Sequence, residues 1–140
     1  MKKHSKLTIF GDGGARGNPG EAAYGFAIFS EDGELLYSEG KRIGKDTNNV
    51  AEYSAVINAF KYVIKHLANA EHITFKLDSL LVSSQMAGKF KVKHPNMKDL
   101  FITAKNLESK ISAQIIYTQI PREENKIADK LVNDALDFKI

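Results

Sequence analysis

Short apolar stretches separated by polar and glycine-rich segments fill the first third of the chain, which is a pattern typical of β-strands. Residues 6–10 predict a strand closed by the glycines of residues 11–14, and residues 15–20 predict a loop containing glycine and proline. Residues 23–30 and 35–42 predict two more strands joined by a tight hairpin. Three consecutive strands with short links indicate an antiparallel meander.

The period of the apolar positions then changes to that of a helix, beginning near Asn48 or Asn49 as the N-cap and continuing through Leu67. Alternation returns in a fourth strand that ends at Asp78, and we expect this strand to be central. The remaining segments predict helices over residues 79–87, 95–109 and 123–138 and a fifth strand over residues 113–120. The order βββ-α-β-αα-β-α predicts an α/β (mixed α+β) fold, with a five-stranded mixed sheet flanked by helices.

Length and composition limit the possibilities further. A chain of 140 residues suits one domain over residues 1–140. The absence of cysteine excludes disulfides and thiolate metal sites, and the net charge of +3 permits a polyanionic partner without requiring one. No apolar stretch has the length of a signal peptide core or a membrane span, so we expect a cytoplasmic, free-standing protein that begins at Met1.

Four carboxylates lie at positions beside apolar residues, where burial of a charged side chain is energetically unfavourable. Asp12 and Asp78 end apolar strands, Glu52 shares the inward stripe of its helix with Val56, and Asp129 leans toward the buried side of the last helix. Carboxylates rarely point inward unless they are paired or bound to a cation. We therefore expect the four to meet at one end of the sheet, in an all-oxygen site suited to magnesium or manganese.

Each acid also has an ordinary explanation when it is taken alone. Asp12 can belong to a turn, Glu52 can be a solvated acid in a first helical turn, Asp78 can cap the next helix and Asp129 can pair with a neighbouring lysine. These explanations do not account for four acids beside apolar faces in this order. The glycine-rich stretch after Asp12 adds support, because its backbone can approach a sugar-phosphate chain closely, although it has neither the Walker nor the dinucleotide spacing.

Read together, four segments resemble the type 1 ribonuclease H family in order and spacing across nearly the whole chain. They are residues 12–20 (DGGARGNPG), 47–52 (TNNVAE), 78–79 (DS) and 125–129 (NKIAD). The resemblance implies a ribonuclease H-like fold and an endonuclease that cuts the RNA strand of an RNA–DNA hybrid, leaving 5′-phosphate and 3′-hydroxyl ends. The sequence leaves the oligomeric state open, and we expect a monomer with no obligate protein partner.

The resemblance assigns roles to individual residues. It implies that Asp12, Glu52, Asp78 and Asp129 are catalytic and hold two Mg²⁺ ions, which Mn²⁺ can replace. It also implies that a second group of residues contacts the substrate. Some of them contact the RNA strand or the minor groove of the hybrid, and others bind a phosphate of the DNA strand, at a position where relatives often carry arginine. The positions concerned are Gly13, Gly14, Asn18, Asn48 and Asn49 for the groove and Lys45 and Thr47 for the phosphate.

Two departures from the family pattern concern the substrate. Many relatives carry a histidine in the loop before the last acid, whereas here residues 120–125 contain none, and our hypothesis is that Arg122 partly fills its role as a cation near the phosphate. Many relatives also insert a basic protrusion after the third acid. Here a brief segment holds Lys89, Lys91 and Lys93, which share one face if the segment is extended and otherwise form a solvated lysine face.

Other functions stay open at this stage. Proofreading exonucleases of the same fold place Asp-x-Glu in the first strand, where this chain has Asp12-Gly13-Gly14, and transposases and integrases usually carry further domains. A ribonuclease H domain of a viral polymerase matches equally well. A hybrid-binding module without catalysis is a further alternative, and the presence of all four acids argues against it. An interaction protein with chance motifs is the last, and it requires four segments to arise in order by chance.

Overall fold

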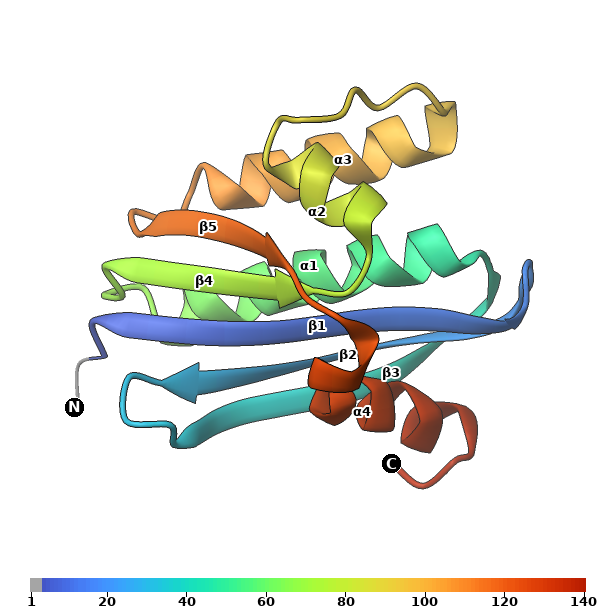
Figure 1. Cartoon of the computed structure of the whole chain (residues 1–140), viewed down its shortest axis with the longest axis horizontal. Coiled ribbons are helices and arrows are strands. Elements are labelled where there is room, and N and C mark those ends of the chain that lie inside the picture. Colours follow the sequence, from blue (N-terminus) through green and yellow to red (C-terminus); the bar gives the residue numbers. More distant parts are fainter. Residues whose placement is uncertain (1–3) are drawn as a thin grey trace.

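A computed structural model describes residues 4–140, so residues 1–3, including the Met1 on which the expectation of a free-standing chain rests, lie outside it. The chain forms one sheet with helices on both faces (Figure 1). The strands are β1 (Lys6–Gly17), β2 (Gly20–Ser30), β3 (Leu35–Asp46), β4 (His72–Leu77) and β5 (Gln114–Gln119). The helices are α1 (Asn48–His66), α2 (Leu80–Met86), α3 (Pro95–Glu108) and α4 (Lys126–Leu136), with a 3₁₀ turn η1 (Arg122–Glu124) before the last.

The sheet is mixed, in the order β3-β2-β1-β4-β5. β1 pairs antiparallel with β2, which pairs antiparallel with β3, whereas β4 runs parallel to both β1 and β5. The predicted five-stranded mixed sheet that begins with three antiparallel strands is therefore confirmed. The prediction that the fourth strand is central is wrong. The middle strand of the five is β1, which lies between β2 and β4, whereas β4 lies next to the edge strand β5.

β1 continues through the stretch that the sequence predicted to be a loop. It runs to Gly17, which pairs with Gly20, so that only Asn18 and Pro19 remain as the turn into β2. Strand pairing uses backbone groups, and a glycine-rich segment keeps those groups even though it lacks the apolar alternation that identifies a strand. The prediction of a loop over residues 15–20 is wrong for this reason, and β3 likewise extends beyond residue 42 to Asp46.

Two helix starts also differ from the prediction. The N-cap of α1 is Thr47, whose hydroxyl accepts a hydrogen bond from the Val50 amide at 3.2 Å, and not Asn48 or Asn49. The closing helix is divided, because Asn125 has φ −111° and ψ 31°, outside the helical range, and separates η1 from α4. The acids at 123 and 124 therefore belong to a 3₁₀ turn, and the continuous helix predicted from residue 123 is wrong at its start.

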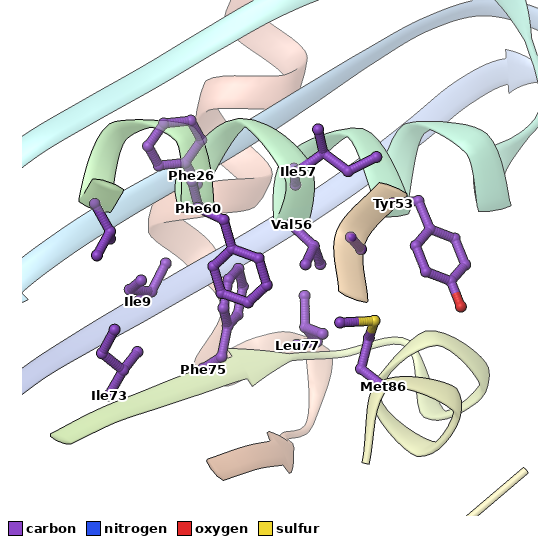
Figure 2. Close-up of a cluster of buried hydrophobic side chains, with 14 of the residues drawn as sticks. Ile9, Phe26, Tyr53, Val56, Ile57, Phe60, Ile73, Phe75, Leu77 and Met86 are labelled. Carbon is purple, nitrogen blue, oxygen red and sulfur yellow. The ribbon is translucent and has the colours of Figure 1, made fainter. Parts of the chain in front are cut away.

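The main core lies between the sheet and α1, with α3 packed outside α1. Figure 2 shows Phe60 of α1 beside Phe75 of β4, with Ile9, Val56 and Leu77 around them. The two phenylalanine rings meet edge to face, with centroids 5.6 Å apart. Full burial of such a side chain stabilises the fold by about 1.5–3 kcal/mol, so this layer fixes α1 firmly against the sheet.

Two glycines let helices approach the sheet from opposite faces. A Cβ on Gly13 would lie 2.2 Å from the carbonyl carbon of Ala51 in α1, and one on Gly25 would lie 2.8 Å from the carbonyl oxygen of Ala128 in α4. Neither distance is compatible with a side chain. The first turns of α1 and α4 are consequently seated directly on the backbone of β1 and β2, as Figure 1 shows for α4 in front of the strands. Within residues 4–140, no helix combines the length and apolar character needed to cross a membrane.

Candidate active site

Three carboxylates from three elements meet at one end of the sheet. Asp12 lies on β1, Glu52 in the first turns of α1 and Asp78 directly after β4. One oxygen from each lies within 4.8 Å of one oxygen from each of the others. The expected convergence of acids at one sheet end is therefore found for these three.

Strand register and close packing produce this meeting. The parallel pairing of β1 with β4 ends at the pair Gly11–Leu77, so that Asp12 and Asp78 are the next residues on adjacent strands. The contact of Gly13 with the backbone of Ala51 and Glu52 holds the third acid against the same strand end. Asp12 and Glu52 are 6% and 7% exposed, which makes them the two buried acids among the described residues.

The electrostatics of this cluster are unfavourable without a cation. Burial, together with the nearby carboxylate of Asp78, raises the pKa of Asp12 to about 7. Burial and then the carboxylates of Asp12 and Asp78 raise the pKa of Glu52 well above its usual range. The carboxylates of the site therefore repel one another when they are ionised, and a bound cation would reduce this repulsion.

The donor set fits a hard divalent cation. The Oε2 atom of Glu52 is buried and accepts no hydrogen bond from residues 4–140, which leaves an acceptor that a metal ion can satisfy. The potential ligand atoms at the cluster are all carboxylate oxygens. Oxygen ligands of this kind are those that magnesium and manganese prefer.

Asp129 lies at the same pocket but outside the cluster of three. The pocket has a volume of about 640 Å³ and is lined by the cluster together with Asp129 and Arg122. The Asp129 side chain is 36% exposed and lies 3.8 Å from an Arg122 nitrogen, so that it faces the open side of the pocket. The arginine also lowers the pKa of Asp12, against the larger effects of burial and Asp78.

The predicted substrate residues divide into two groups. Gly13, Gly14 and Asn48 line the pocket, whereas Asn18, Lys45, Thr47 and Asn49 do not. Asn48 makes two hydrogen bonds to the segment around the β1–β2 turn. Its side-chain Oδ1 accepts from the backbone amide of Ala15 at 2.8 Å, and its backbone amide donates to Oδ1 of Asn18 at 3.0 Å. The start of α1 is thus locked to the turn between β1 and β2, next to the pocket.

Two residues at the site were not singled out from the sequence. Arg16 lines the pocket and donates to Asp137 at 2.6 Å, which ties the end of β1 to the end of α4. Asn125 is fully buried and donates to Asp78 at 3.1 Å. The sequence offered a signal for Asn125, because it lies in the segment of residues 125–129 that carried the resemblance, but its polar side chain gave no indication of burial.

The order of the elements and the carboxylate cluster define a protein of the ribonuclease H-like fold. A family model described as "Reverse transcriptase-like" matches residues 10–135, which is most of the chain. Among solved structures, ribonuclease H1 from the halophilic archaeon Halobacterium salinarum is 34% identical with a TM-score of 0.89, over 96% of this chain and 99% of that one. The chain belongs to the type 1 ribonuclease H family.

Two further relatives refine this placement. The N-terminal ribonuclease H domain of Rv2228c from Mycobacterium tuberculosis is 41% identical with a TM-score of 0.89, covering 96% of this chain and 95% of that one. LC11-RNase H1, solved in complex with an RNA/DNA hybrid, is 38% identical with a TM-score of 0.90, covering 95% and 98%. The chain spans only 36% of the length of the bifunctional mycobacterial protein itself, so the likeness there is to one of its domains.

Proposed function

We propose that this protein is a single ribonuclease H domain that hydrolyses the RNA strand of RNA–DNA hybrids. The observation that carries the proposal is the buried meeting of Asp12, Glu52 and Asp78 beside an open pocket. The 38% identity to LC11-RNase H1, a protein solved with an RNA/DNA hybrid, supports a hybrid as the substrate. We also propose that the protein acts as a monomer.

In this proposal Asp12, Glu52, Asp78 and Asp129 hold two Mg²⁺ ions, for which Mn²⁺ can substitute. When bound, such a pair of cations supplies an activated water and stabilises the charge on the leaving oxygen, which gives 5′-phosphate and 3′-hydroxyl ends. Asp12 and Glu52 are buried, whereas Asp78 and Asp129 are half-buried and are proposed to lie nearer the scissile phosphate. Four fixed carboxylates also repel the substrate unless cations are present, which makes cleavage depend on metal.

The residues beside the pocket are suited to reading the RNA strand. An enzyme that separates RNA from DNA must recognise the 2′-hydroxyl, which both donates and accepts hydrogen bonds. The backbone of Gly13 and Gly14, which line the pocket, and the side-chain amides of Asn18, Asn48 and Asn49 provide groups of both kinds. Lys45 and Thr47, at the junction of β3 and α1, are proposed to bind a phosphate of the DNA strand.

The proposal is tested by incubating the purified protein with an end-labelled RNA–DNA hybrid in Mg²⁺, in Mn²⁺ and in a chelator. Parallel reactions contain double-stranded DNA, double-stranded RNA and single-stranded RNA of the same sequence. We expect internal cuts in the RNA strand of the hybrid that require metal. Salt-sensitive hybrid binding without cleavage in either metal would instead identify a binding module.

Replacing Arg122 with alanine is expected to lower kcat by about tenfold, which corresponds to about 1.4 kcal/mol of transition-state stabilisation. The reason is that the guanidinium stands 3.8 Å from Asp129 at the pocket edge, as a cation near the expected scissile phosphate. The control is Lys126→Ala, which removes an exposed cation four residues away that does not line the pocket. An unchanged kcat in Arg122→Ala means that this residue does not take the place of the missing histidine.

The lysine segment after α2 has a bend in place of an extended strand. Lys89 lines a cleft beside β5, while Lys91 lines a different cleft against α3, so that the two do not share one face. The arrangement of three lysines in a row, which depended on an extended segment, is therefore not present. We expect the triple replacement of Lys89, Lys91 and Lys93 by alanine to lower the log–log salt slope of hybrid binding by about one unit, the effect of a single phosphate contact.

The matched control removes three exposed lysines elsewhere, at positions 61, 65 and 110. It lowers the net charge by the same amount, so a general electrostatic effect changes both slopes equally. Equal slopes in the two triple variants would remove the segment from the binding surface.

A further inference from the structure

Asn125 connects the elements that carry the acids. It lies between η1 and α4 and is 0% exposed. Its side-chain nitrogen donates to the carbonyl oxygen of Gly11 at 2.8 Å and to Oδ2 of Asp78 at 3.1 Å. Gly11 immediately precedes Asp12, so one amide group bridges the end of β1 and the acid that follows β4.

The orientation of this amide is fixed by its neighbours. A carbonyl and a carboxylate only accept hydrogen bonds, and a side-chain NH₂ group supplies two donors. The opposite orientation would place the Asn125 oxygen against two acceptors and leave all three without a hydrogen atom between them. Asp78 accepts this bond and still offers an oxygen to the cluster, because a carboxylate has about four acceptor sites.

The backbone of Asn125 holds the fourth acid as well. Its carbonyl oxygen accepts from the amide of Asp129 at 3.0 Å, the first helical hydrogen bond of that residue. A single residue therefore contacts Asp78 through its side chain and Asp129 through its main chain. Displacement of Asn125 moves both acids relative to Asp12.

The burial of Asn125 is costly for the fold. Its Oδ1 atom is buried and has no hydrogen-bond partner within the described part of the chain. An unsatisfied buried acceptor costs about 1–3 kcal/mol. An apolar residue of similar size would avoid this cost, but it would lose both the hydrogen bond to the Gly11 carbonyl and the hydrogen bond to Asp78.

We propose that Asn125 is a positioning residue that holds the Asp78 carboxylate in the orientation required to bind a divalent cation together with Asp12 and Glu52. The inference rests on the proposed function for its metal, but not on the identity of the substrate. Hydrogen bonds that orient a metal-binding carboxylate typically contribute about 10- to 100-fold in metal affinity or activity. The expected consequence of losing the amide is weaker metal binding with little change in the KM for the hybrid.

The test measures metal binding directly, by calorimetric titration with Mn²⁺ and by the increase in Tm that Mn²⁺ produces. The variants are Asn125→Ala, which removes the donor, and Asn125→Asp, which keeps the shape but replaces the donor by an acceptor. We expect both to weaken Mn²⁺ binding by about 10- to 100-fold. The Mn²⁺ concentration for half-maximal cleavage is expected to rise by the same factor, with KM within about twofold of wild type at saturating metal.

A matched control is Asn58→Ala in α1, which removes a side-chain hydrogen bond of 2.8 Å to the Ser54 carbonyl away from the pocket. It is expected to leave Mn²⁺ binding unchanged. Wild-type affinity in either Asn125 variant overturns the proposal, as does a wild-type protein that binds no Mn²⁺. If neither Asn125 variant folds, the residue belongs to the fold and the proposal is wrong.

The same measurements separate this proposal from the proposed function. A wild-type protein that binds Mn²⁺ but cuts no hybrid contradicts the proposed function. Loss of that Mn²⁺ binding in the Asn125 variants would still support the positioning role. The double variant Asp78→Asn with Asn125→Ala is expected to bind Mn²⁺ no more weakly than Asp78→Asn alone, because the two residues act through one contact.

Discussion

Replacing Asp78 with asparagine is expected to reduce cleavage of an RNA–DNA hybrid by more than about a hundredfold. Loss of a residue that only supports a metal ligand typically costs about 10- to 100-fold, and Asp78 is itself one of the three acids of the cluster. Asparagine keeps the size of the side chain and can still accept the Asn125 hydrogen bond, but it lacks the charge that attracts a cation. The rate is measured under single-turnover conditions in saturating Mg²⁺.

The control for this variant is Asp32→Asn, in the exposed hairpin between β2 and β3. It makes the same chemical change outside the pocket, and its cleavage rate is expected to equal that of the wild type. Asp78→Asn is also expected to bind the hybrid, because the substitution impairs the cleavage reaction and leaves the affinity for the substrate in place. Cleavage within about tenfold of wild type in Asp78→Asn, a loss of no more than about 1.4 kcal/mol, would falsify the assignment of this acid to the catalytic centre.

The metal-free protein is expected to become less stable as the pH rises from about 4 to 7, relative to an Asp12→Asn variant. The pKa of Asp12 is raised to about 7 in the folded protein from an ordinary value of 3.8, first by burial and then by Asp78. Between these values the folded state binds more protons than the unfolded state, so the free energy of unfolding falls with rising pH. The raised pKa of Glu52 acts in the same direction.

The measurement is urea unfolding in a chelator at several pH values, for the wild type and for Asp12→Asn. At pH 8 the variant is expected to be more stable by a few kcal/mol, since about 1.4 kcal/mol accompanies each unit of pKa shift. The difference is expected to vanish only well below pH 3.8, where the wild-type carboxyl is protonated in both states. Saturating Mg²⁺ is expected to reverse the order, because it stabilises only the protein that keeps its acid. A variant less stable than wild type at pH 8 in chelator would contradict the repulsion between the acids.

The sequence predicted much of this structure because its strongest patterns are periodic. The apolar residues of α1 and the alternation in β4 identified their elements to within a residue or two. Glu52 was correctly expected to be buried, since its spacing from Val56 places both on the inward stripe. The positions of the acids on strand ends and helix faces predicted that they meet at one end of the sheet, and the family resemblance added their catalytic and metal-binding roles.

The sequence could not show features that depend on backbone pairing or on contacts between distant segments. Residues 15–17 were expected to lie in a loop because this segment lacks apolar alternation, yet their backbone pairs with β2. Asn125 carries a polar side chain that usually lies at the surface, and only the neighbouring Gly11 carbonyl and Asp78 explain its burial. The position of β4 beside the centre depends on β5, which lies some forty residues later in the chain.

The two glycines beneath the helices have a consequence for how this site tolerates mutation. At Gly13 and Gly25 the neighbours of a new Cβ are mainly backbone atoms, which cannot rotate away as a side chain does. We therefore expect a substitution there to displace the start of the helix, and with it Glu52 or Asp129. The expected effect of such a substitution is a change in the distances between the acids. The chain can remain folded while the acids lie too far apart to bind one cation together. The spacing between the acids therefore depends on residues that have no functional group at all.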